Sequence, residues 1–259
     1  MPKKNPEGQM PLSEHLREFR TRTLLSILGL LVGAVGGWFL FDPVFNSLAA
    51  PVLALEELGQ NAVLNFNTVA SAFDMRMRVA LFIGAIVASP WWLYQMWAFL
   101  APGLKRTERR YVLGFTAVTI PLFLLGAALG WLLLPHAVRV FMSFTPDAGA
   151  NFIDARTYLT FSMRVVLAFG FSFLFPVVMV TLNMLGLVRA GTYARGWRWA
   201  VVLLFTLSAI ANPLPDPWTM IALGLIMTAL YYAAVGICLL NDRRRDRRQA
   251  QRDAELGLA

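Results

Sequence analysis

Six long apolar segments, separated by polar loops, constrain the fold of this chain of 259 residues more than any other feature. They cover residues 24–41, 79–100, 111–134, 161–187, 199–212 and 218–240. A helix needs roughly 20 apolar residues to cross the hydrocarbon core of a bilayer, and most of the six approach that length. A spanning segment must satisfy its own backbone polar groups, which a helix does. We therefore predict an all-α integral membrane protein with six transmembrane helices, an interpretation that agrees with a mean hydropathy of +0.58.

The basic residues fall almost entirely on alternate sides of these segments. Lysines and arginines gather before the first segment, between the second and third, between the fourth and fifth, and after the sixth, whereas the remaining loops hold only Arg76, Arg78, Arg139 and Arg156. Cytoplasmic loops of membrane proteins carry an excess of basic residues. We therefore expect both termini to be cytoplasmic. The formal charge of +8 is then a topology signal, and anchoring at anionic lipid explains the basic tail better than nucleic-acid binding.

The same pattern divides the chain into three parts. Residues 1–23 are a cytoplasmic tail with an interfacial helix, residues 24–240 the transmembrane domain, and residues 241–259 a basic cytoplasmic tail expected to be disordered. The first apolar segment is too long for the apolar core of a signal peptide, so we expect it to be retained. The fifth and sixth helices are expected to be short. The prolines between them predict a tight hairpin that either thins the bilayer or packs a compact bundle.

Two further patterns concern local packing. Pro51 stands near the start, and Gly59 just past the end, of a run that predicts a short interfacial helix within residues 50–59. Glycines at positions 29, 33 and 37, and again at 126 and 130, recur at a helical spacing that lets helices approach closely in a membrane. Packing within the chain is the favoured interpretation of these glycines, over a homodimer seam.

Signatures of enzymes and of metal sites are absent from the sequence. No zinc-protease motif, phosphate-binding glycine loop or nucleophile elbow occurs, and His136 has no partners at metal-ligand spacing. A secondary transporter of a small solute is the alternative class, and it would place ionisable groups or broken helices near the middle of the membrane. Pro90, Pro121 and Pro176 interrupt apolar segments, but Arg164 is the only ionisable residue well inside one.

Acidic residues on the predicted cytoplasmic side are the candidate binding groups. Leu12, Leu16 and Phe19 recur at helical spacing, which predicts an amphipathic helix with Glu18 on its polar side, and Glu108 is the sole acid in a basic loop. Carboxylates beside a membrane suit a cationic peptide, because arginine pairs with them in a bidentate fork. The ordinary alternative is structural ion pairing, of Glu18 with Arg22 and of Glu108 with Lys105, and composition alone favours it.

Residues 15–22, His-Leu-Arg-Glu-Phe-Arg-Thr-Arg, resemble the H-L-x-E-L-R-x-R pattern that opens the TatC family, the multi-spanning receptor subunit of the twin-arginine protein translocase. The resemblance extends over residues 10 to 240. Its further matches, in order, are Pro51, Ser89-Pro90, Tyr94-Gln95, Trp97-Ala98-Phe99, Pro102-Gly103-Leu104, Glu108-Arg109-Arg110, Asp154 with Tyr158, Phe169-Gly170, Phe173, Pro176 and Pro215-Asp216.

The resemblance implies a non-enzymatic receptor in the cell membrane, without a cofactor, that binds twin-arginine signal peptides of folded cargo. It implies a cupped bundle that works with single-span partners of the TatA/TatB type, driven by the proton-motive force, in a larger complex with several copies of the chain. Carried over by position, Glu18 and Glu108 bind the arginine pair, and Phe99 and Arg20 belong to the same site. Residues with a role in translocation or structure are Pro51, Asp216, Asp154 and Pro90.

The sequence also departs from the family pattern. Leu174 and Tyr232 stand where relatives commonly carry glutamate, and Met220 where they carry glutamine. Burying a carboxylate in lipid is costly unless it is paired, so these replacements remove demanding polar groups. Contacts with partner helices must then be apolar or come from other polar residues, and the candidates are Tyr231, Tyr232, Thr206, Ser208 and Arg164.

Overall fold

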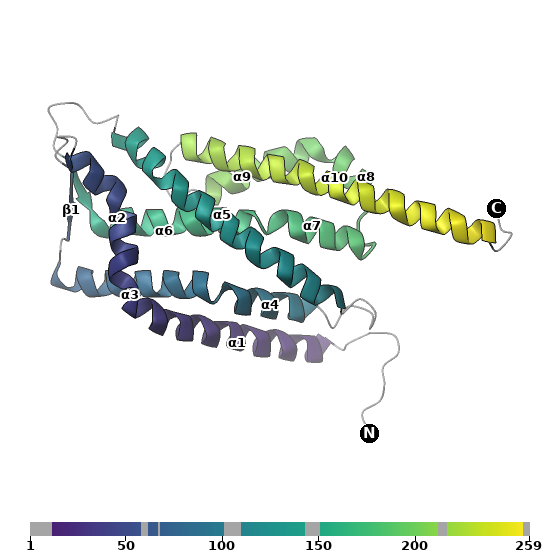
Figure 1. Ribbon diagram of the computed structural model, residues 1–259, viewed down its shortest axis with the longest axis horizontal. Helices are drawn as coiled ribbons and strands as arrows, with labels where there is room; N and C mark the ends of the chain where they lie inside the picture. The colour runs from purple at the N-terminus through teal and green to yellow at the C-terminus, as the bar shows by residue number, and fades with distance from the viewer. Residues whose placement is uncertain are drawn as a thin grey trace, which may run out of the picture.

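The computed structural model describes residues 12–57, 62–66, 68–100, 110–142, 151–211 and 217–255. Nearly all of them are helical, and the helices form an elongated bundle (Figure 1). In chain order the elements are α1 (Leu12–Phe39), α2 (Phe41–Glu57), β1 (Ala62–Asn65), α3 (Val69–Val87), α4 (Ser89–Leu100), α5 (Arg110–Met142), β2 (Asn151–Asp154), α6 (Ala155–Ser172), α7 (Phe175–Met184), α8 (Ala190–Arg195), α9 (Trp197–Ala211) and α10 (Pro217–Glu255).

Several of these helices are long and apolar enough to cross a bilayer. Four such stretches occur in the described residues, within α1, α5, the α6–α7 pair and α10, and the bent pair of α3 and α4 makes a fifth. The prediction of an all-α protein with several membrane spans is therefore confirmed. The predicted short fifth helix corresponds to α9, which is apolar but has only 15 residues.

Two predicted boundaries are wrong because helices continue through polar sequence. The interfacial helix expected before residue 24 is part of α1, which runs unbroken from Leu12 to Phe39. The sixth helix is not short, since α10 has 39 residues, and residues 241–255 of the expected disordered tail are helical. Residues 12–28 contain no glycine or proline, and neither do residues 241–255. No helix-breaking residue therefore ends α1 or α10 within these stretches.

Proline positions explain the bends. The predicted single segment 79–100 is a pair of helices bent by 59°, and Pro90 is the second residue of the second helix. Proline lacks a backbone N–H and suits the first turn of a helix. Pro176 takes the same place in α7, so both predicted interruptions are confirmed, whereas Pro121 lies inside the continuous α5. Pro51 also lies inside a helix, because α2 already begins at Phe41, which corrects the predicted start near residue 50.

Close approach of helices at glycine confirms packing within the chain. A Cβ atom added at Gly37 of α1 would lie 2.5 Å from the carbonyl oxygen of Ala80 in α3. One added at Gly126 of α5 would lie 2.6 Å from the carbonyl oxygen of Phe169 in α6. These contacts hold α1 against α3, and α5 against α6, at backbone distance.

Three of the four arginines predicted outside form ion pairs, with two carboxylates between them. The Asp74 carboxylate lies 2.8 Å from Nε of Arg78 and 3.3 Å from Nε of Arg156, which joins α3 to α6. Arg76 lies 3.8 Å from Asp42 and over the rings of Trp38 and Phe41. Pairing lowers the cost of holding arginine near lipid.

A short parallel sheet closes this end of the bundle, opposite to the start of α1 and the end of α10 (Figure 1). Ala62–Asn65 pairs in register with Asn151–Asp154. Beneath it, the buried Tyr158 hydroxyl donates to the Leu48 carbonyl oxygen at 2.8 Å, which ties α6 to α2. The sequence analysis predicted neither strand.

Candidate functional site

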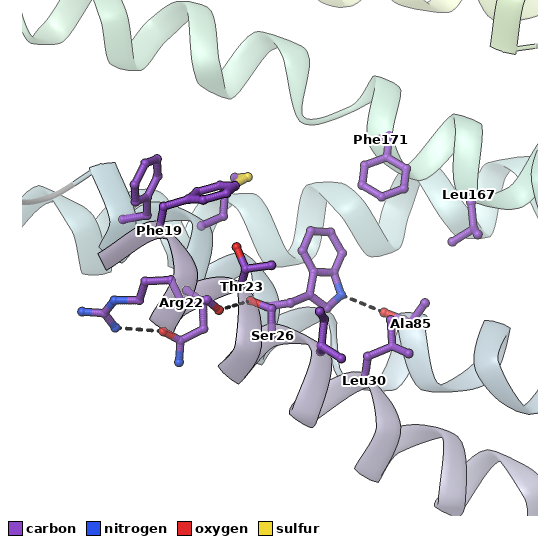
Figure 2. Close-up of a pocket in the computed structure, with 13 residues that line it drawn as sticks. Phe19, Arg22, Thr23, Ser26, Leu30, Ala85, Leu167 and Phe171 are labelled. Carbon is purple, nitrogen blue, oxygen red and sulfur yellow. Dashed lines mark hydrogen bonds between the residues drawn. The ribbon is translucent and has the colours of Figure 1, made fainter. Parts of the chain in front are cut away.

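The candidate site is a pocket of about 460 Å³ between α1, α4 and α6, close to the start of α1 (Figure 2). Its walls are mostly apolar and aromatic. The lining side chains include Phe19, Ile27 and Leu30 of α1, Trp92, Met96 and Phe99 of α4, and Leu167 and Phe171 of α6. Such a pocket suits an apolar segment or side chain.

Helical spacing and tryptophan hydrogen bonds build these walls. The α1 residues that line the pocket recur every three or four positions, so they share one face of the helix. Nε1 of Trp91 donates to the Leu25 carbonyl oxygen of α1, and Nε1 of Trp92 donates to the Ala85 carbonyl oxygen of α3, each at 2.9 Å. The indoles therefore fix α4 against α1 and α3, and the second of these bonds is drawn in Figure 2.

Polar groups gather at the end of the pocket away from Leu167 and Phe171, where Arg22 lies (Figure 2). Arg22 donates to Oε1 of Gln95 at 2.8 Å and to Oε1 of Glu18 at 3.4 Å. Gln95 is only 2% exposed, whereas the Glu18 side chain is 23% exposed. The buried amide thus holds the guanidinium, and the guanidinium in turn lies beside a carboxylate that solvent still reaches.

Aromatic rings cover the same end of the site. The ring of Phe99 stacks on His15 at a centroid distance of 4.6 Å and meets Phe19 edge-on at 5.4 Å. Aromatic pairs of this geometry add stability beyond the area that they bury. Phe99 of α4 is therefore fixed against α1 within one turn of Glu18.

The structure brings together two of the residues predicted for peptide binding. Glu18 and Phe99 lie at the same end of the pocket, because Glu18 pairs with the lining residue Arg22 and Phe99 contacts Phe19, the next residue along the chain from Glu18. Arg20 is exposed and, two positions after Glu18, points to a different side of α1. Glu108 and Asp216 lie outside the described residues.

Asp154 and Pro90 have structural positions. Asp154 is the N-cap of α6, and its carboxylate accepts a hydrogen bond from the Thr157 backbone N–H at 2.7 Å. The Thr157 side chain and backbone, together with Arg156, hold the pKa of Asp154 below its ordinary value. Pro90 stands at the bend between α3 and α4.

The residues predicted to meet partner helices fall into two groups. Tyr231 is buried and its hydroxyl donates to the Tyr193 carbonyl oxygen at 2.6 Å, and buried Ser208 donates to the Met220 carbonyl oxygen, so both act within the chain. Tyr232 is 48% exposed. Thr206 and Arg164 are also exposed, and the Thr206 hydroxyl donates to the Val202 carbonyl oxygen in its own helix.

Arg22, Gln95 and His15 are site residues that the sequence analysis did not assign. Gln95 belongs to the quoted Tyr94-Gln95 match, which was the available signal, but its partner is 73 positions away. Among the described residues, no group of three His, Cys, Asp or Glu side chains is placed to hold a metal ion.

The fold and its site define a helical, multi-pass membrane protein with an apolar pocket and a carboxylate at one end of the bundle. The chain belongs to the TatC family: residues 14–225 match the family model described as Sec-independent protein translocase protein (TatC). It is therefore a protein of the protein-transport machinery.

Relatives carry the same family name. A protein from Xylanimonas cellulosilytica is 49% identical over 243 residues, which cover 93% of this chain and 88% of the relative. A second, from Rothia mucilaginosa, is 40% identical over 249 residues, covering 95% of this chain and 85% of the relative. Both are named Sec-independent protein translocase protein TatC.

Solved structures share the fold. A crystal structure described as the twin arginine translocase receptor TatC superposes with a TM-score of 0.74 at 29% identity, covering 87% of this chain and 98% of that one. A crystal structure of a receptor of the same description in DDM gives a TM-score of 0.76 at 27% identity, covering 86% and 99%.

Proposed function

We propose that this chain is the receptor and core subunit of a twin-arginine protein translocase, and that it binds the twin-arginine signal peptides of folded cargo. The observation that carries the proposal is a carboxylate, Glu18, whose side chain is 23% exposed and which lies beside Arg22 at the polar end of an apolar pocket. A signal peptide offers the complementary pattern, because its basic residues precede an apolar segment. The arginines would meet the carboxylate while apolar side chains enter the pocket.

The ion pair between Glu18 and Arg22 in the free chain is compatible with binding of a peptide arginine to Glu18. Arg22 lies 3.4 Å from Glu18 in a partly exposed pair four positions apart on one helix, and helix pairs at this spacing contribute only roughly 0.3–0.5 kcal/mol. The same guanidinium has a closer partner in Gln95. An incoming arginine in bidentate geometry could therefore replace Arg22 at the carboxylate while Gln95 retains Arg22. Glu108 is proposed as the second acid, with Phe99 as an aromatic wall.

A six-span topology with both termini in the cytoplasm completes the proposal. The crossing that adds to the five long apolar stretches is α9, the fifth in chain order, whose 15 residues fit a locally thin membrane. The start of α1 and the end of α10 lie toward the same end of the bundle, as an even number of crossings requires (Figure 1). The basic loops favour the cytoplasm for that end. The cell membrane is the location we propose from membership of the family.

Partner assembly follows from the family. We propose that single-span proteins of the TatA/TatB type dock on the exposed helix faces that include Tyr232, Thr206 and Arg164, within a complex containing several copies of the chain and driven by the proton-motive force. Pro51 and Asp216 are proposed to serve translocation rather than recognition. A small-solute transporter is not proposed, because the pocket walls are apolar and its polar groups lie at the end of the bundle.

Photo-crosslinking of a labelled twin-arginine signal peptide in native membranes tests the receptor function. Glu18→Gln and Glu108→Gln should each lower labelling about tenfold or more, equivalent to about 1.4 kcal/mol, as should replacing the peptide arginines with lysines. Glu14→Gln, one turn away on the same helix, removes the same charge and should leave labelling nearly unchanged. Labelling that is absent, or equal in all variants, would overturn the proposal.

A further inference from the structure

The end of α10 carries a basic face that the proposed peptide site does not use. Residues 241–255 extend beyond the rest of the bundle (Figure 1). Arg244, Arg245, Arg248 and Arg252 recur at helical spacing and face a groove of about 700 Å³, whose other wall includes Met184 and Leu185 at the end of α7. Four cations thus share one groove with apolar side chains and with one carboxylate, that of Asp253, which leaves the groove with an excess of positive charge.

Hydrogen bonds to the buried Asn183 and to the backbone of α8 hold the base of this extension in place. The Asp242 carboxylate accepts from Nδ2 of Asn183 at 2.9 Å and from the Ala190 backbone N–H at 2.8 Å. Nδ2 of Asn241 donates to Oδ1 of Asn183 at 3.0 Å. Asn183 is 1% exposed, so the network is costly to break. The groove is therefore formed by two helices fixed to each other.

Arg245 also borders a second, smaller cavity of about 150 Å³, which Asp242 and Asp246 line as well. Gly186, another residue of that cavity, lies against this arginine. The Gly186 φ of 74° lies in the left-handed region, and a Cβ atom there would lie 2.7 Å from Nη1 of Arg245. A side chain at position 186 would displace the guanidinium. The salt bridges formed within the described part of the chain involve other arginines, so the four groove cations have no carboxylate within 4.0 Å there.

The groove lies where lipid head groups are. Apolar sequence in α10 ends at Leu240, which is exposed, as is Met184. At 1.5 Å per residue, Arg244 and Arg248 lie about 6 and 12 Å beyond Leu240 along the helix. The head-group layer is roughly 5–7 Å thick. Helical side chains lean toward the N-terminus, here back toward the membrane, which places the guanidinium of Arg244 within the head-group layer and directs that of Arg248 toward it.

We propose that this groove is a binding site for the phosphate of an anionic phospholipid, with its glycerol and acyl end toward Met184 and Leu185. Guanidinium groups bind phosphate in bidentate geometry, and a basic cluster directly beyond a transmembrane helix attracts anionic lipid. A free phosphate would satisfy the arginines but not the exposed apolar wall. The site is separate from the peptide pocket and does not depend on the proposed receptor function.

A charge-matched pair of variants distinguishes a site from diffuse attraction. Arg244→Gln with Arg248→Gln removes two groove cations, whereas Arg243→Gln with Arg247→Gln removes two cations from the same helix that do not line the groove. Glutamine preserves helix propensity at all four positions, and circular dichroism checks folding. The full chain is placed in nanodiscs of phosphatidylcholine with or without phosphatidylglycerol, and retained lipid is counted by native mass spectrometry after detergent extraction.

The groove pair should lower phosphatidylglycerol retention about tenfold, while the control pair should leave it nearly unchanged. Equal losses in both pairs would mean diffuse surface attraction, and no loss in either would mean no site; each outcome overturns the proposal. Inorganic phosphate is added in a parallel arm. If inorganic phosphate displaces the retained lipid at millimolar concentration, the groove is a site for free phosphate, and the proposal that it binds an anionic phospholipid is wrong.

Discussion

The guanidinium of Arg22 organises the candidate site through two unequal contacts. The shorter contact goes to Gln95, which is buried, and the longer to Glu18, which is not. A hydrogen bond to a charged group typically contributes about 1.5–3 kcal/mol. Gln95 is therefore a positioning residue: it keeps Arg22 from closing fully on the carboxylate that we propose for the incoming arginine.

Gln95→Leu should test this arrangement. Leucine fills similar space but accepts no hydrogen bond, so the unfolding temperature in detergent should fall, and Arg22 should shift toward Glu18 and weaken signal-peptide labelling several-fold. Gln95→Glu keeps an acceptor and serves as the control, with labelling closer to that of the unmodified chain. Unchanged stability and labelling in the leucine variant would show that the Gln95 contact is incidental.

The Asp154 cap predicts a pH dependence of stability. Because the native pKa lies below the ordinary value of 3.8, mainly through its hydrogen bonds with Thr157, the carboxylate stabilises the fold above that value. This stability is lost as the pH falls through the lowered pKa. Asp154→Ala should cost about 1 kcal/mol at neutral pH. Asp154→Asn retains an acceptor that does not titrate, so the unfolding temperature should fall less steeply with decreasing pH than in the unmodified chain. An equally steep fall would contradict the stabilising role of the Asp154 carboxylate.

For single residues, the sequence predicted which side chains belong to the site better than which side chains contact one another. Glu18 and Phe99 were predicted from a family pattern, and both lie at the same end of the pocket, Glu18 beside Arg22 and Phe99 against Phe19. The bond from Arg22 to Gln95 joins residues 73 positions apart, and no periodicity in either segment predicts it. Tyr231 was predicted to face partners, but its hydroxyl finds a backbone acceptor inside the bundle.

Among the helices, the contact of α1 with α3 sets the position of the site. Gly37 approaches the α3 backbone so closely that a side chain there would force the helices apart, whereas a Cβ at the adjacent Gly36 would meet nothing within 4 Å. Any displacement of α1 moves Glu18 and Phe19 relative to α4.

Gly37→Leu and Gly36→Leu form a matched pair that tests this packing. Overpacking at Gly37 should destabilise the fold by about 1–3 kcal/mol and reduce peptide labelling. The Gly36 variant, with the same change in helix propensity, should show nearly normal unfolding temperature and labelling. Equal effects in both variants would mean that the glycines act through backbone flexibility and not through close approach.

Apolar segments predicted the existence of the helices but not all of their ends. Hydropathy predicts which residues lie in the hydrocarbon core of the membrane, whereas a helix ends where its backbone loses hydrogen-bonding partners. Polar sequence free of glycine and proline therefore extends α1 to Leu12 and α10 to Glu255. The strands β1 and β2 have four residues each, and their pairing depends on two distant loops meeting in space.

For the whole molecule, the distribution of charge predicts the orientation in the membrane. In a Cys238→Ser background, a cysteine at Asn65 in β1 should react with a membrane-impermeant maleimide in intact cells, because β1 lies at the predicted outer end. A cysteine at Thr192 in α8 should react only after the membrane is made permeable. Labelling of the Thr192 variant in intact cells would contradict the six-span topology.

The pocket itself depends on the arrangement of the entire bundle. It opens because α1 packs on α3 and α4 but leaves the pocket-facing side of α6 partly uncovered. No local pattern encodes such a gap, so the sequence predicted a cupped bundle only through family resemblance. Membership of the TatC family then gives the pocket a proposed ligand, which its own chemistry supports.

A double-mutant cycle on peptide affinity tests the central claim most directly. The equilibrium affinity of the purified chain in nanodiscs is measured for twin-arginine and twin-lysine peptides, with Glu18 intact and with Glu18→Gln. If Glu18 contacts the arginines, each single change should weaken binding about tenfold, and both together should weaken it little more than either alone. Additive losses would contradict the account, because they would mean that Glu18 and the peptide arginines act independently.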